Sequence, residues 1–107
     1  MNKNEFLALA KKPKLIHIKA LNTDIHLVEF SYRGAIEISR CSDPVDRAVF
    51  SLINSVSDES GKLLFGTDDI ESLSELFSFP AISEIAEKAT ALSTPATDAA
   101  TVKQPAS

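Results

Sequence analysis

The chain has 107 residues, of which 44% are apolar and 24% are charged, a composition typical of one small globular domain. Fifteen acidic and eleven basic side chains give a net charge of −4, which disfavours nucleic acid as a partner because a phosphate backbone attracts basic surfaces. A domain of this size hides only about 60 to 65% of the surface of its unfolded chain, which argues against a deep substrate cavity.

The use of cysteine and the N-terminal sequence indicate where the protein acts. The one cysteine, Cys41, can form neither an internal disulfide nor a thiolate metal cluster, as suits a reducing compartment. The first residues lack the apolar run of a signal peptide, and no stretch of about 18 apolar residues could cross a bilayer. We therefore expect an intracellular protein that has no membrane partner.

The composition changes at Ser93. From there to the end, the sequence STPATDAATVKQPAS contains two prolines and no leucine, isoleucine or aromatic residue. Such a segment cannot bury enough apolar surface to fold. The sequence thus predicts a single domain over residues 1–92 and a disordered tail over residues 93–107.

The first half of the domain has the pattern of a helix followed by a β-hairpin. Apolar residues over 6–10 predict a short helix, stopped by Pro13, which disfavours helical backbone before it. Residues 14–21 and 24–30 are rich in β-branched and apolar side chains, and turn formers such as Asn22 separate them. These features predict two antiparallel strands that share one covered face.

The next segments carry signals of helices. Residues 32–41 could continue a sheet or form a helix, and we favour the helix. Pro44 suits the first helical position and opens a predicted helix over residues 44–57. Its apolar side chains recur at helical spacing: Val45, Val49, Leu52, Ile53 and Val56.

The last third of the domain predicts a turn at 58–61, an extended connector or small strand over 62–65 and two further helices. The first begins at Thr67, beside acidic residues that suit a helix start. Its apolar stripe is Ile70, Leu73, Leu76 and Phe77. Ser78 and Pro80 open the final helix. The expected fold class is α+β, with an N-terminal β-hairpin or small antiparallel sheet packed against a small helical bundle.

Residues that could carry chemistry are few. His17 and His26 would share a face of the hairpin if its turn held two residues, and would face opposite ways if it held three. No further ligand follows at a spacing typical of zinc sites, and no cysteine-protease signature surrounds Cys41. We therefore expect strand histidines, a thiol at the core edge, and no catalytic site, metal or cofactor.

Three phenylalanines close together in the sequence, Phe65, Phe77 and Phe79, allow two interpretations. Large rings are usually buried, so all three could belong to the core. A small domain has limited room for them, however, and an exposed apolar patch usually marks an interface. The second interpretation predicts a partner-binding surface that also contains Leu63, Leu64 and Leu73.

Residues 49–92 resemble the C-terminal half of the tail assembly chaperones of long-tailed bacteriophages, which carry a pattern like V-x-D-E-x-G-x-x-L-F. The matching residues are Val56, Asp58, Glu59, Gly61, Leu64 and Phe65, followed by Asp68, Asp69, Ile70, Leu73 and Leu76. The hairpin sequence KLIHIKALNTDIHLVEF is similar to the short β-element that precedes the helices in that family.

The resemblance implies a non-catalytic protein of the host cytoplasm. Such a chaperone binds the tape-measure protein, keeps its apolar helices soluble until the tail tube polymerises, and is absent from the mature virion. The tail tube protein is a second candidate partner, and the family often has a longer frameshifted form. An uncovered edge strand would also allow a homo-oligomer.

Two other functions compete with this one. A small non-catalytic adaptor or inhibitor that binds one protein partner would have the same composition. An enzyme with a site around His17 and His26 is the third hypothesis.

Overall fold

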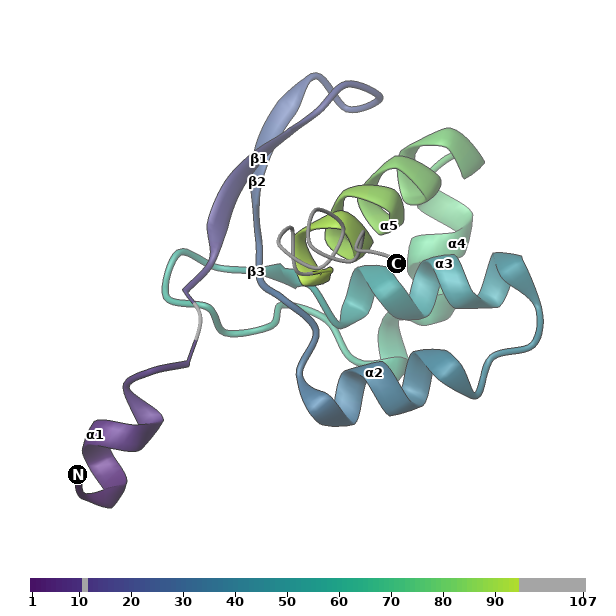
Figure 1. Cartoon of the computed structure of the whole chain (residues 1–107). Coiled ribbons are helices and arrows are strands. Elements are labelled where there is room, and N and C mark those ends of the chain that lie inside the picture. Colours follow the sequence, from purple (N-terminus) through teal and green to yellow (C-terminus); the bar gives the residue numbers. More distant parts are fainter. Residues whose placement is uncertain (11, 95–107) are drawn as a thin grey trace, which may run out of the picture.

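The computed structural model describes residues 1–10 and 12–94, and it confirms the α+β class (Figure 1). Three antiparallel strands form a sheet in the order β1-β2-β3. The elements are α1 (Lys3–Leu7), β1 (Lys14–Ile18), β2 (Thr23–Leu27), α2 (Tyr32–Ser39), α3 (Pro44–Ile53), β3 (Val56–Ser57), the 3-10 turn η1 (Thr67–Asp69), α4 (Ile70–Leu76) and α5 (Phe79–Ser93). The predicted tail lies outside the described residues from position 95 onward.

The predicted hairpin is present, but its loop is longer than either alternative considered from the sequence. Ile18 pairs with Thr23, so the loop spans residues 19–22. Asn22 adopts a positive φ of 51° there, as turn asparagines often do. The inner face carries Ile18 and Leu27, which are fully buried. Because strand residues alternate between faces, His17 and His26 both lie on the outer face.

The predicted helix over residues 44–57 is wrong at its C-terminal end, because α3 ends at Ile53. The amide of Asn54 donates to the Phe50 carbonyl at 2.9 Å, and the Ser55 hydroxyl donates to the Ser51 carbonyl at 2.8 Å. Such side-chain bonds to the preceding turn compete with helix continuation. Val56 then pairs with Leu27 of β2. A residue that fits the helical period therefore becomes part of the sheet.

The predicted helix after the hairpin is confirmed as α2, which packs against the end of α3 (Figure 1). The Ser31 side chain accepts a hydrogen bond from the Gly34 backbone N–H and caps the helix. A Cβ at Gly34 would lie 2.7 Å from Oδ1 of Asn54, so only glycine allows this approach. Asn54 also donates to Glu37 of α2 at 2.8 Å.

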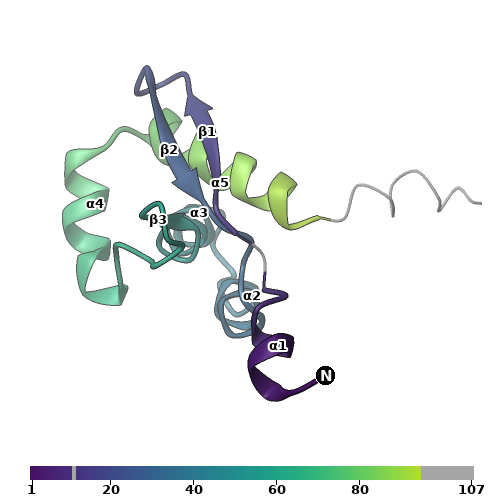
Figure 2. The same cartoon turned by 90° about the vertical axis from the view of Figure 1, so that its left-hand side faces the viewer.

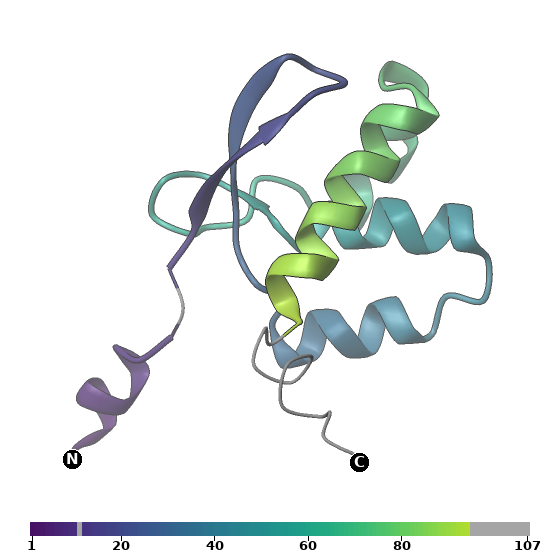
Figure 3. The ribbon, with the colours of Figure 1, turned by 45° about the horizontal axis from the view of Figure 1, so that its top comes forward.

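The final predicted helix is confirmed as α5, which begins after the Ser78 cap. Figures 2 and 3 show α5 running beside the hairpin and across α3. The core lies between these elements and α4, and its buried residues are Ile18, Leu27, Val49, Leu52, Ile53, Val56, Leu73, Ile82, Ile85 and Ala89. Within the described residues, no helix is both long enough and apolar enough to cross a membrane.

The hairpin loop is anchored to α5 by a carboxylate. Glu84 accepts hydrogen bonds from the backbone N–H groups of Ala20, at 2.8 Å, and Lys19, at 2.6 Å. These two bonds, helped by the neighbouring Lys88, lower the pKa of Glu84 below its ordinary value. Lys88 also donates to the His17 carbonyl at 2.9 Å. The hairpin is therefore held over α5 at its loop end as well as through its buried face.

Candidate partner-binding surface

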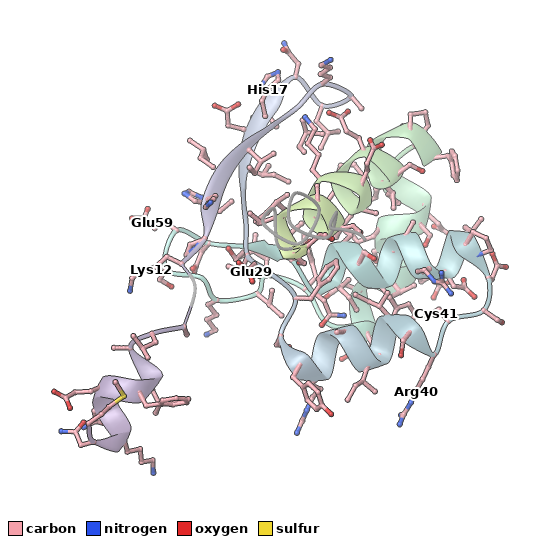
Figure 4. All side chains as sticks on the ribbon, viewed as in Figure 1. Lys12, His17, Glu29, Arg40, Cys41 and Glu59 are labelled. Atoms are coloured by element: carbon pink, nitrogen blue, oxygen red, sulfur yellow. The ribbon has the colours of Figure 1, made fainter. Side chains whose placement is uncertain are left out.

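The histidines and the cysteine occupy separate parts of the molecule. Nδ1 of His17 lies 2.6 Å from Oδ1 of Asp24 across the strand pair, and His26 lies opposite Leu15. Figure 4 shows His17 near the loop end of the hairpin and Cys41 beyond the end of α2. Within residues 1–10 and 12–94, no three His, Cys, Asp or Glu side chains gather as metal ligands would.

An apolar depression lies between the hairpin, the connector over residues 62–65 and α4. The connector is held beside β3, because Leu64 donates its N–H to the Val56 carbonyl at 3.1 Å. The depression has a volume of about 210 Å³. All its lining residues are apolar: Leu21, Ile25, Leu52, Val56, Leu64, Phe65, Leu73, Phe77 and Ile85.

The lining residues of this first depression divide into supports and exposed side chains. Leu73 is only 4% exposed and fixes α4 to the core. Leu64 is 54% exposed and Phe77 is 37% exposed. An apolar side chain of a partner that enters here would remove the surfaces of Leu64 and Phe77 from water, which favours binding by about 25 cal/mol per Å² of apolar surface.

A second depression of about 190 Å³ lies between α3, α4 and α5. Phe77 lines both this depression and the first. The lining residues are Val45, Asp46, Ala48, Val49, Ile70, Ser74, Phe77, Phe79 and Ile82, among which Asp46 carries the only formal charge.

A wider groove of about 700 Å³ continues from the second depression along α3 and α5. Val45, Ala48 and Phe79 line both hollows. The side chains of Phe77 and Phe79 therefore stand between three successive hollows, and we refer to the three hollows together as the apolar track. Three adjoining hollows with a mainly apolar lining suit an extended or helical segment better than a compact small molecule.

The structure brings five of the six predicted binding residues to this track. Leu64, Phe65, Leu73 and Phe77 line the first depression, and Phe79 lines the second depression and the groove. The sixth, Leu63, is exposed but lines none of the three hollows.

The interpretation that all three phenylalanines are core residues holds only for Phe65, which packs against the core. Phe77 is partly open to solvent, and Phe79 is 66% exposed. Phe77 has extended backbone at the end of α4, and Phe79 is the first residue of α5. Only Phe77 and Ser78 separate α4 from α5. The rings of Phe77 and Phe79 lie at this short connection and remain at the surface.

Two residues of the predicted helical stripes lie elsewhere than expected. Leu76, predicted on the inward stripe, is exposed on α4, because the helix has only seven residues and turns its last one outward. Val45, predicted among the apolar residues at helical spacing in 44–57, is 58% exposed and lines two of the hollows. Helical spacing places Val45 on the same side of α3 as the buried residues. It does not show that the first turn of α3, which contains Val45, lies outside the core.

Comparison with known proteins supports the fold. No model of a known family matches the chain, and the search of curated proteins finds no significant match. A solved structure described as "Structure of bacteriophage HK97 tail assembly chaperone" superposes with a TM-score of 0.63 at 19% sequence identity. The match covers 88% of this chain and 100% of that one. The resemblance seen in the sequence is thus confirmed at the level of the fold.

Proposed function

We propose that this protein is a phage tail assembly chaperone that binds the tape-measure protein through the apolar track. One observation carries the proposal: on a fold shared with the HK97 tail assembly chaperone, Leu64, Phe77 and Phe79 surround adjoining apolar hollows at the surface. Contiguous exposed apolar surface on a small domain usually marks an interface.

The shape of the track supports a helical partner segment. An amphipathic helix binds a groove through apolar side chains spaced three or four residues apart. Successive hollows separated by Phe77 and Phe79 can receive such side chains one after another. Aromatic residues are frequent among those that dominate binding energy, so we assign the largest contributions to these two rings.

The proposed role is non-catalytic and requires no metal or cofactor. The protein would act in the host cytoplasm, hold the apolar helices of the tape-measure protein apart until the tube forms, and be absent from the mature virion. The tail tube protein is a second proposed partner. Because β1 is at an edge of the described sheet, pairing of β1 with another copy is a proposed route to a homo-oligomer.

The test compares tagged protein recovered from cells that assemble tails with purified virions from the same culture, both by mass spectrometry. We expect the tape-measure protein to be recovered with the tagged chain, and the chain to be absent from virions. Presence in virions would make it a structural tail component. Recovery with a host protein alone would indicate an adaptor or inhibitor instead.

The same experiment with variants tests the surface. The double variant Leu64→Ser with Phe77→Ser should lose the tape-measure protein, because both side chains line the first depression. The matched control is Leu15→Ser, which removes an exposed leucine from the outer face of the hairpin. Circular dichroism confirms that each variant is folded. Equal recovery with the double variant and the control would contradict the assignment of the surface.

A further inference from the structure

The charges of the chain are distributed unevenly. Between Lys62 and Lys88 lie six of the fifteen acidic side chains and none of the eleven basic ones. The acidic residues there are Asp68, Asp69, Glu71, Glu75, Glu84 and Glu87. The segment with no basic residue contains η1, α4 and the first half of α5. Helices α4 and α5 carry part of the lining of the apolar track, and α3 carries another part.

Several of these carboxylates remain available to a partner. Glu71 and Glu75 are exposed on α4, and within the described residues neither forms an ion pair or a side-chain hydrogen bond. Glu87 lines the wider groove, and Asp46 of α3, outside this segment, lines the second depression. Glu84 is not in this group, because its carboxylate is already bonded to the hairpin loop.

Two basic residues are close to the track in the chain: Lys62, which opens the connector that carries Leu64, and Arg47. Arg47 is the one basic residue among those that line the three hollows. Its guanidinium donates to the Cys41 carbonyl at 2.8 Å, which directs it toward the connection between α2 and α3. The charged residues that line the hollows are therefore Asp46, Glu87 and Arg47, while Glu71 and Glu75 lie on α4 next to the lining residues Ile70 and Ser74.

We infer that the segment bound by the apolar track is an amphipathic helix with lysine or arginine residues beside its apolar face. The inference rests on the proposed function and specifies the chemistry of the partner. Apolar burial supplies the affinity, while opposite charges at the rim steer association and fix orientation. A helix with acidic flanks would meet Glu71 and Glu75, and like charges brought together at an interface disfavour the complex.

The test uses three synthetic peptides and the full chain, with binding followed by fluorescence anisotropy. Two peptides share one leucine face and carry either lysine or glutamate at the polar positions, and a third keeps the lysines but has serine in place of leucine. We expect the lysine peptide with leucines to bind at least about tenfold more tightly than the other two. Its affinity should fall as salt rises, because salt screens exposed charges.

A matched pair of variants separates a local effect from net charge. Glu75→Lys reverses a charge on α4, while Glu59→Lys makes the same change in the 58–61 turn, which Figure 4 shows on the side of the hairpin base. We expect Glu75→Lys to weaken the lysine peptide by about three- to tenfold, as for an exposed charge at an interface rim. Glu59→Lys should leave its affinity unchanged.

The outcomes distinguish this inference from the proposed function. If both variants weaken the lysine peptide equally, or if the serine peptide binds as well as the leucine one, the attraction is general and the inference is wrong. If the tape-measure protein is recovered equally with Glu75→Lys and at high salt, the function stands and the basic flank is refuted. If the tape-measure protein is not recovered even with the unmodified chain, the proposed function itself fails.

Discussion

Helices α1 and α4 are both short and both present large apolar side chains to solvent, yet they differ in how they are attached. Figures 1 and 3 show α1 apart from the other helices, and none of its residues is buried. Helix α4 is anchored by Leu73, and Ile70 packs against the same core. This difference is why we propose the binding surface beside α4 and not on α1. A fixed arrangement is needed, since ordering a mobile segment opposes binding.

The connections on either side explain this difference. The Asp69 carboxylate accepts a hydrogen bond from the Gly66 N–H at 2.8 Å, which holds the entry to α4. At the exit, Ser78 caps α5 directly after Phe77. Helix α1 has a local cap formed by Asn2 and Glu5, but none of its residues is buried.

The largest expected effect is on the anchor of α4. Leu73→Ala should lower the free energy of unfolding by about 2 to 5 kcal/mol, the range for truncating a buried leucine, because this side chain is almost wholly buried. Urea denaturation measures this change in the free energy of unfolding. Leu76→Ala, on the exposed side of the same helix, should change stability by less than about 0.5 kcal/mol. Equal losses would mean that α4 is not held by Leu73.

A matched pair of phenylalanines sharpens the comparison between the two helices. Phe79 lines the apolar track and Phe6 belongs to α1, and their exposed fractions are 66% and 64%. Phe79→Ser should reduce recovery of the tape-measure protein by about tenfold, in the range of an interface aromatic residue, whereas Phe6→Ser should not. Quantitative mass spectrometry of the recovered complexes measures the amount of tape-measure protein bound to each variant. The reverse order would place the site on α1.

Anchoring can also be tested with pH at the hairpin loop. The pKa of Glu84 is lowered by the N–H groups of Ala20 and Lys19, so its carboxylate stabilises the fold above the ordinary pKa of 4.5. This contribution is lost as the pH falls below that value and through the lowered pKa. Unfolding by urea at a series of pH values should show a steeper loss for the unmodified chain than for Glu84→Gln. Parallel curves would contradict the role of these bonds.

The smallest expected effect is that of removing residues 1–10. Because no residue of α1 is buried, the shortened chain should unfold within about 0.5 kcal/mol of the full chain, as for changes at exposed positions. Thermal unfolding followed by circular dichroism measures this. A clear loss of stability would show that α1 packs against the rest of the domain in solution. The two helices would then not differ in how they are attached.

Local signals predicted a large part of the fold. The start of α5 follows from Ser78 and Pro80, and the hairpin follows from two β-rich runs with Asn22 between them. A cap, a proline and a turn act within three or four residues, so their effects can be read without knowing what packs against them. The apolar residues around α4 were identified for the same reason, as a local concentration of leucine and phenylalanine.

Contacts between distant segments decided the rest. Val56 fits the helical period of α3 but joins β2, because the backbone of β2 offers it a strand partner. Leu73 and Leu76 lie on the same predicted stripe, yet packing against the core covers only the first. The sequence by itself thus determined which residues are apolar and where locally capped elements such as α3 and α5 begin, but not the position of β3 or the start of α4 at Ile70 after the 3-10 turn at Thr67. Only the tertiary structure decided which apolar residues remain exposed, because burial depends on the surfaces that other elements bring.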